Sequence, residues 1–149
     1  MVAHVYDQNQ NLIFVSLRMK KQTDIDLSEF IGLQLKEVNS HLFLFDKGKL
    51  EIDCPWRVRD KLIYLCPNVL DFSYNEKKAK EIVTKNLIGR KIKSIKIFNL
   101  PCDVEIIFDN GAILEIFPIH PLYESWNLKK MNGKHLIGIG GGDIQAFKM

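Results

Sequence analysis

The sequence predicts an α+β domain that consists mainly of antiparallel β-sheet. Three observations lead to this fold class: two stretches resemble each other, each has the alternation of a β-hairpin, and one amphipathic helical segment lies between them. The repeats cover about residues 30–66 and 87–139, and we expect pseudo-twofold symmetry between them. The whole chain, 1–149, is long enough for a single domain with one sizeable core.

The repeat is supported by three blocks of matching residues in the same order. They are FIGLQLKEV and LIGRKIKSI (from Phe30 and Leu87), FDKG and FDNG (from Phe45 and Phe108), and LEI twice (from Leu50 and Leu114). The spacing between the copies changes only where loops are expected. Three blocks in one order favour duplication of an ancestral module over chance.

Each copy has the same expected local structure. A glycine, Gly32 or Gly89, ends a helical or turn-like stretch with a positive φ. A hairpin follows, and its turn is best marked by Asn110-Gly111 in the second copy. Residues 103–108 alternate polar and apolar, so we expect one buried face, whereas 41–45 are apolar on both faces and are expected to be covered on both, in the more central sheet.

The one well-marked helix is expected over about residues 75–87. Its apolar residues recur at helical spacing and form one stripe: Ala79, Ile82, Val83 and Leu87. Ser73 or Asn75 can cap the start of this helix and Gly89 can end it. A helical turn is expected at 26–30, and strands are expected at 11–17, 61–65, 126–130 and, as the last strand, 135–139.

Composition excludes disorder and a membrane span. The chain is 46% hydrophobic and 10% aromatic, and no apolar run approaches the roughly 18 residues that a span needs. The first ten residues lack the pattern of an export signal, and Cys54, Cys66 and Cys102 form no CxxC pair. We therefore expect a cytoplasmic protein with no disulfide, metal or other cofactor, and no membrane partner.

The net charge is only +3, but basic residues concentrate between Lys77 and Lys96, where Glu81 is the single acid. Such an excess can attract phosphates or an acidic protein surface. The candidate anion-binding residues are Lys85, Arg90, Lys91, Lys93 and Lys96. The alternative is a solvated helix face, which the lack of interleaved aromatic residues favours.

Catalytic motifs are weak throughout the chain. The glycine-rich segment from Gly138 to Gly142 has neither the spacing nor the following helix of a phosphate loop, and we interpret it as a strand end. Glu51 and Glu115 occupy equivalent positions in the two copies. If they lay within about 10 Å of each other they could act in acid–base chemistry, whereas on half-exposed strands they would simply face water.

The two tryptophans lie in the most distinctive strings, CPWR and ESWN. Because tryptophan and arginine are enriched at protein–protein hot spots, the candidate protein-binding residues are Trp56, Arg57, Glu124 and Trp126. If the tryptophans are core residues instead, each indole N–H needs a hydrogen-bond acceptor.

Together CPWR, DNGAILEIFP, ESWNL and the terminal GGG resemble the pattern of small uncharacterised bacterial proteins, some of which are immunity proteins that neutralise toxins. The resemblance extends over about residues 31–142. It implies a cytoplasmic bacterial protein that binds a protein partner, and it carries no catalytic residues.

The sequence thus favours a non-enzymatic protein-binding module, of which an immunity-type protein is one form. A phosphate- or nucleic-acid-binding protein that uses segment 77–96 and a small enzyme with a carboxylate pair are the alternatives. Exposed strand edges in a small repeat protein also permit a homodimer.

Overall fold

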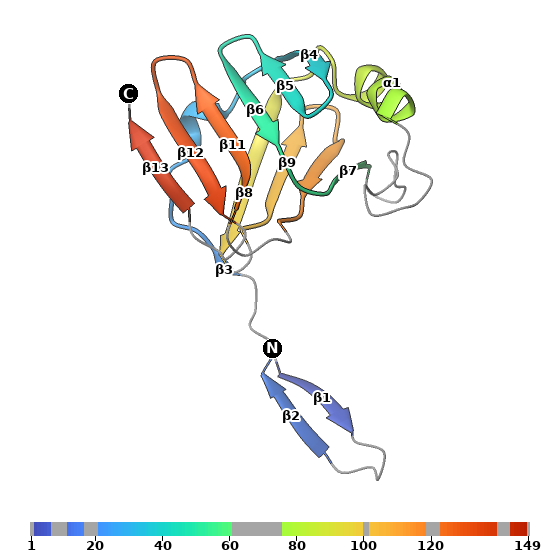
Figure 1. Ribbon diagram of the computed structural model, residues 1–149, viewed down its shortest axis with the longest axis vertical. Coiled ribbons are helices and arrows are strands. Elements are labelled where there is room, and N and C mark those ends of the chain that lie inside the picture. Colours follow the sequence, from blue (N-terminus) through green and yellow to red (C-terminus); the bar gives the residue numbers. More distant parts are fainter. Residues whose placement is uncertain are drawn as a thin grey trace.

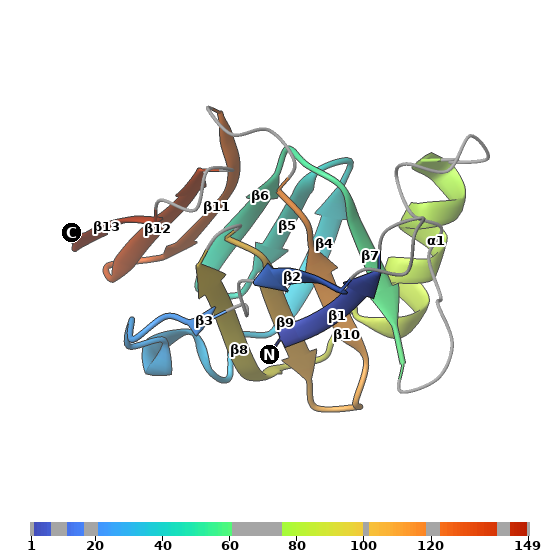
Figure 2. The ribbon, with the colours of Figure 1, turned by 90° about the horizontal axis from the view of Figure 1, so that it is seen from below.

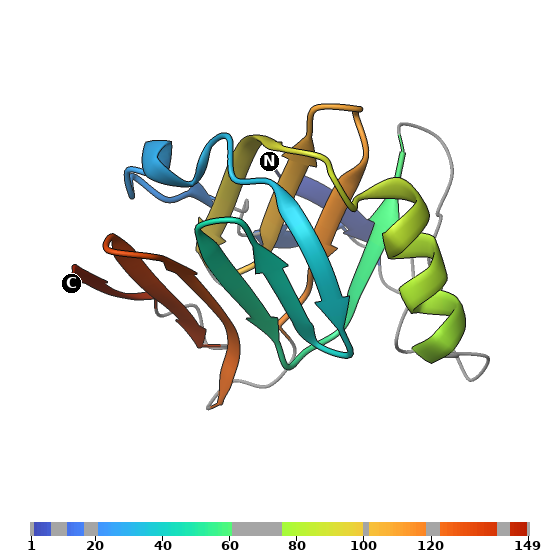
Figure 3. The ribbon, with the colours of Figure 1, turned by 90° about the horizontal axis from the view of Figure 1, so that it is seen from above.

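The fold consists of two antiparallel β-sheets that lie as layers on one hydrophobic core, with α1 (Glu76–Asn86) beside them. The structure is a computed structural model, and it describes residues 2–6, 12–16, 21–60, 76–99, 102–118, 123–139 and 144–148. Figures 2 and 3 show both layers, with α1 on the side where β4 (Leu35–Asn39) and β7 (Trp56–Arg59) lie. The predicted class, mainly antiparallel sheet with one helix, is confirmed.

The five-stranded sheet has the order β3-β8-β9-β10-β7. Its further members are β3 (Lys21–Gln22), β8 (Ile92–Asn99), β9 (Val104–Phe108) and β10 (Ile113–Ile116). The six-stranded sheet has the order β13-β12-β11-β6-β5-β4. Its further members are β5 (Leu42–Phe45), β6 (Gly48–Ile52), β11 (Glu124–Lys130), β12 (Lys134–Ile139) and β13 (Ile144–Lys148).

The two sheets exchange strands. The meander β4-β5-β6 is followed by β7, which crosses to the other sheet and pairs with β10. The meander β8-β9-β10 is followed by β11, which crosses in the opposite direction and pairs with β6. As a result Trp56 lies opposite Ile116 and Trp126 lies opposite Ile52. The strand that follows each meander in the chain pairs with the last strand of the other meander.

Most local expectations agree with the observed elements. The helix begins and ends within a residue of the expected 75–87, and Ala79, Val83 and Leu87 are buried. Gly32 and Gly89 have φ of 88° and 82°, as predicted for glycines that end a helical stretch. Strands at 11–17 and 126–130 are confirmed as β2 (Leu12–Ser16), which pairs with β1 (Val2–Tyr6), and as β11. Figure 1 shows that hairpin apart from the two sheets.

Some expectations need correction. The segment at 135–139 forms β12 but is not the last strand, because β13 follows it and pairs with it. The helical turn at 26–30 is a 3-10 turn over Ser28–Phe30 only. The expected strand at 61–65, Cys66, and the glycines at 140–142 lie outside the described residues. Among the helices that the structure describes, none is long and apolar enough to cross a membrane.

The strand at 42–45 is not covered on both faces, and its sheet is not the more central one. Phe43 and Phe45 are buried, whereas Leu42 and Leu44 are half-buried. The physical reason is that each sheet turns one face to the shared core and the other outward. In β9 the expected alternation is confirmed, because Val104, Ile106 and Phe108 face the core.

Both tryptophans belong to the core, with Trp56 only 5% exposed and Trp126 only 1%. The Trp126 Nε1–H donates a hydrogen bond of 2.8 Å to the carbonyl oxygen of Cys102, which satisfies the buried indole. The Trp56 ring meets Phe43 edge-on, with ring centroids 5.5 Å apart. These contacts tie the ends of the exchanged strands to the core.

Candidate functional site

The predicted protein-binding residues do not form one surface. Trp56 and Trp126 are buried, so neither ring is available to a partner. Arg57 is half-buried on β7 in the five-stranded sheet, and Glu124 is exposed at the start of β11 in the six-stranded sheet. Arg57 and Glu124 therefore lie on different sheets, because β7 belongs to the five-stranded sheet and β11 to the six-stranded sheet.

The predicted anion-binding residues are all exposed, but they are spread over three elements. Lys85 lies on α1, Arg90 and Lys91 lie in the turn after it, and Lys93 and Lys96 lie on β8. Lys96 is the cross-strand neighbour of Glu105, an acid on β9. The basic segment therefore provides dispersed surface charge, and the hollows described below contain none of its residues.

The two equivalent carboxylates are not brought together. Glu51 stands between buried Leu50 and Ile52, and Glu115 stands between buried Leu114 and Ile116. Because side chains alternate along a strand, each carboxylate points away from the core, and the two strands belong to opposite sheets. The alternative that pairs Glu51 with Glu115 in acid–base chemistry is therefore not supported by the fold, because the two carboxylates lie on the outward faces of different sheets.

The outer face of the five-stranded sheet is closed by ion pairs. Glu115 is only 8% exposed, and its Oε2 accepts a 2.9 Å hydrogen bond from Arg57 Nε. Its other oxygen, Oε1, pairs with Arg59. The Arg57 guanidinium also lies 4.8 Å above the centre of the Phe117 ring. A hollow of about 350 Å³ lies beside this cluster, and both arginines that line it are already paired with Glu115.

The outward side of the six-stranded sheet, here called the open face, is different. One row of directly opposed cross-strand neighbours crosses five strands, from β5 to β13. The row consists of Leu44, Lys49, Lys129, His135 and Phe147, and on β4 the cross-strand neighbour of Leu44 is the exposed acid Glu37. No described element covers this row in Figure 1, which looks onto the face. We call its three central members, Lys49, Lys129 and His135, the basic row.

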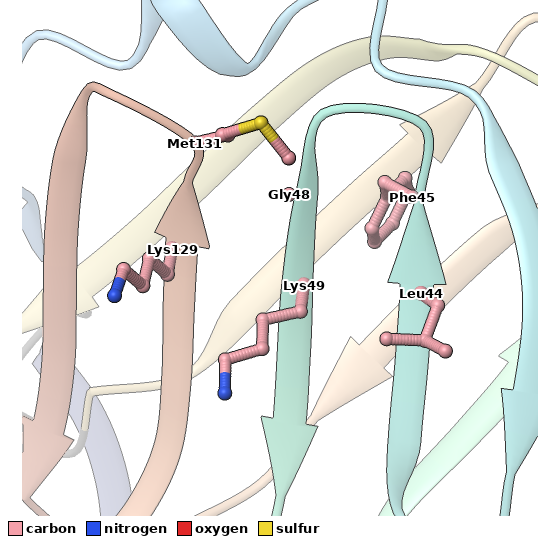
Figure 4. A pocket seen from close by; sticks show the side chains of 6 residues that line it. All are labelled: Leu44, Phe45, Gly48, Lys49, Lys129 and Met131. Atoms are coloured by element: carbon pink, nitrogen blue, oxygen red, sulfur yellow. The ribbon is translucent and has the colours of Figure 1, made fainter.

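At one end of the basic row lies a hollow of about 380 Å³, which we call the outer hollow. Its lining residues are Leu44, Phe45, Gly48, Lys49, Lys129 and Met131. Figure 4 shows Met131 reaching from the turn after β11 toward Gly48, while both lysines lie along neighbouring strands. Met131 is 61% exposed and Phe147, at the far end of the row, is 49% exposed. Apolar surface thus lies at both ends of a basic stripe.

The basic row has little internal compensation. Lys49 Nζ lies 3.0 Å from Glu51 Oε1, but within the described part of the chain no carboxylate lies within 4.0 Å of Lys129 Nζ. Partial burial, together with the positive charges of Lys129 and Lys49, holds the pKa of His135 below its ordinary value. His135 Nε2 lies 2.5 Å from Asn127 Oδ1. Among the described residues, the open face therefore carries an unpaired positive charge at Lys129 beside its apolar groups.

Sequence reasoning missed the open face because its members are far apart in the chain. Lys49 and Lys129 become neighbours only when β11 crosses over to β6. The one available signal was the apolar character of both faces at 41–45. It indicated that Leu44 lies on the face opposite Phe43 and Phe45, but it also led to the expectation of a covering layer, and no described element forms one.

No described group of three His, Cys, Asp or Glu side chains could hold a metal ion. No family model, curated protein or solved structure matches this chain.

Proposed function

We propose that the chain is a non-enzymatic protein-binding module and that it binds its partner with the open face. The observation that carries this proposal is the combination of exposed Met131 and Phe147 with a lined hollow on an uncovered sheet face. Apolar side chains grouped in this way on a surface typically mark an interaction site. An immunity-type protein that neutralises a toxin is one form of this function.

Ancestral duplication with pseudo-twofold symmetry belongs to the proposal, and reciprocal hydrogen bonds support it. Three backbone N–H to O=C bonds have a counterpart of the same length between the matching residues of the other copy. The pairs are Gly32 to Ile92 and Gly89 to Leu35 (2.8 Å each), Asp46 to Gln34 and Asp109 to Lys91 (2.9 Å each), and Asp53 to Ser125 and Phe117 to Pro55 (2.8 Å each). The bridge between Gln34 and Lys91 lies where the symmetry axis would pass.

On this view the two outward faces began alike and then diverged. In the second copy Glu115 is buried under two arginines, which closes the face of the five-stranded sheet. In the first copy the equivalent Glu51 remains half-exposed and contacts only Lys49 among the described side chains. This difference supports the open face as the binding surface, because the charged groups on the outward face of the first copy are more exposed than those of the second copy.

Site-specific photo-cross-linking tests the proposal. The cross-linker p-benzoylphenylalanine replaces Met131 or Phe147 on the open face, or Lys80 on α1 as a matched exposed control. We expect positions 131 and 147 to yield the same cross-linked protein in a lysate of the source cells, and position 80 to yield none of it. Equal cross-linking from all three positions, or none from the open face, would contradict the proposal. Circular dichroism checks that each variant is folded.

A further inference from the structure

We infer that the partner presents an acidic segment to the open face, with carboxylates over the basic row and one apolar side chain in the outer hollow. The inference rests on the proposed function and adds the chemistry of the partner. Two observations carry it: the sign of the lysine charges in the row, and the shape and lining of the hollow.

The charge argument begins with the register. Lys49 lies directly opposite Lys129, and Lys129 lies directly opposite His135. The like charges of Lys49 and Lys129 repel each other across the sheet, and an acidic partner would be attracted to both, whereas His135, with its lowered pKa, adds little charge at neutral pH. Neighbouring strands are about 4.8 Å apart, so the row spans about 10 Å. Carboxylates two residues apart on a strand are about 7 Å apart, and those three or four apart on a helix are about 5–6 Å apart, so such a pair can reach two neighbouring members of the row.

The hollow adds an apolar requirement. Leu44 and Met131 form its sides, and Gly48 leaves its floor without a side chain. A volume of about 380 Å³ accommodates a leucine, methionine or phenylalanine side chain from the partner. Methionine is unbranched and adapts to the shape of what it contacts, so Met131 can fold over such a side chain.

Two other occupants fit less well. Nucleic acid would find one exposed aromatic ring in the row, Phe147, because the Phe45 ring beside the hollow is buried, and a series of stacking platforms is therefore lacking among these residues. A second copy of this chain, docked through the same face about a twofold axis, would bring one basic row against another. An acidic protein segment needs no stacking platform, and it brings opposite charge to the two lysines.

The experiment uses the full chain and defined probes. Random peptides displayed on phage are selected on the folded protein, and the enriched peptide is measured by fluorescence anisotropy. We expect enrichment of Asp or Glu around one apolar residue. The double variant Lys49→Gln/Lys129→Gln should bind the peptide at least about tenfold more weakly, and the single variant Lys129→Gln at least about threefold more weakly. The matched control, Lys77→Gln/Lys80→Gln on α1, removes the same charge and should change the affinity less than twofold.

Several results would overturn the inference. These are enrichment of neutral or basic peptides, no enrichment at all, equal weakening by the face and control variants, tighter binding of a dT20 oligonucleotide than of the peptide, or self-association through the face in sedimentation. Cross-linking from Met131 and Phe147 separates the two levels. If those cross-links form but binding ignores the lysines, the acidic partner is wrong and the proposed function stands. Unchanged urea midpoints show that the variants are folded.

Discussion

The contact between Trp126 and Gly138 gives the sharpest test of how the exchanged strand β11 is held. A Cβ atom added at Gly138 would lie 2.1 Å from Cε2 and 2.3 Å from Nε1 of the Trp126 indole. The ring is 1% exposed and donates its N–H to the Cys102 carbonyl, so it has nowhere to move without losing that bond. We therefore expect Gly138→Ala to be among the most destabilising single-methyl changes in the chain.

Two contributions set the magnitude of this effect. Overpacking a tight core costs about 1–3 kcal/mol, and leaving a buried hydrogen-bond partner unsatisfied costs about 1–3 kcal/mol. We expect Gly138→Ala to lower the free energy of unfolding by about 3 kcal/mol. For a chain of this length that corresponds to a fall in melting temperature of about 6–12 °C.

A double-mutant cycle isolates the contact. Trp126→Leu removes the ring, so Gly138→Ala in that background should cost less than about 1 kcal/mol. Urea unfolding followed by far-ultraviolet circular dichroism measures all four proteins, since the signal does not depend on tryptophan. If the effects of the two substitutions on the free energy of unfolding are additive to within about 0.5 kcal/mol, the close approach of Gly138 to the indole is not the cause of the destabilisation.

Three further predictions concern charged and reactive groups. Glu115→Gln should lower the free energy of unfolding, measured in urea, by about 1–2 kcal/mol, because two arginines lose their charge partner. Glu51→Gln should lower it by less than about 0.5 kcal/mol, because its ion pair with Lys49 is partly exposed. Similar losses for both variants would contradict the difference between the two outward faces. Lys129→Gln should raise the pKa of His135 toward its ordinary value in an NMR titration, and an unchanged pKa would refute the proximity of the two charges. Because the folded protein holds this pKa below 6.5, the unfolded chain takes up the proton first as pH falls, so the same variant should lose less stability on acidification below about pH 6.5. Partial burial raises the pKa of the half-buried Cys54 thiol to about 12. At about pH 8 iodoacetamide should therefore label Cys54 at least tenfold more slowly in the folded than in the urea-unfolded protein, as read by mass spectrometry, and equal rates would refute the raised pKa.

Local patterns in the sequence were enough to predict the helix and the hairpin strands, but not β1, β3, β7 or β13. The helix over Glu76–Asn86 follows from apolar residues at helical spacing, and the hairpin strands follow from alternation around Asp-Lys-Gly and Asp-Asn-Gly. Gly32 and Gly89 were placed correctly because a positive φ is a local property that glycine tolerates best. β13 was missed because its five residues follow a glycine-rich segment and carry little periodicity.

The surface was decided by pairing between distant strands. Strand exchange places Lys49 beside Lys129, sends Glu51 and Glu115 to opposite sides, and buries both tryptophans. Alternation shows that a side chain leaves one face of a strand, but it does not show which strand lies beside it or whether anything covers that face. By itself the sequence determined which segments became helix and strand, because that information is local. Only the tertiary structure decided which charges and apolar groups became neighbours, because cross-strand register depends on contacts between residues far apart in the chain.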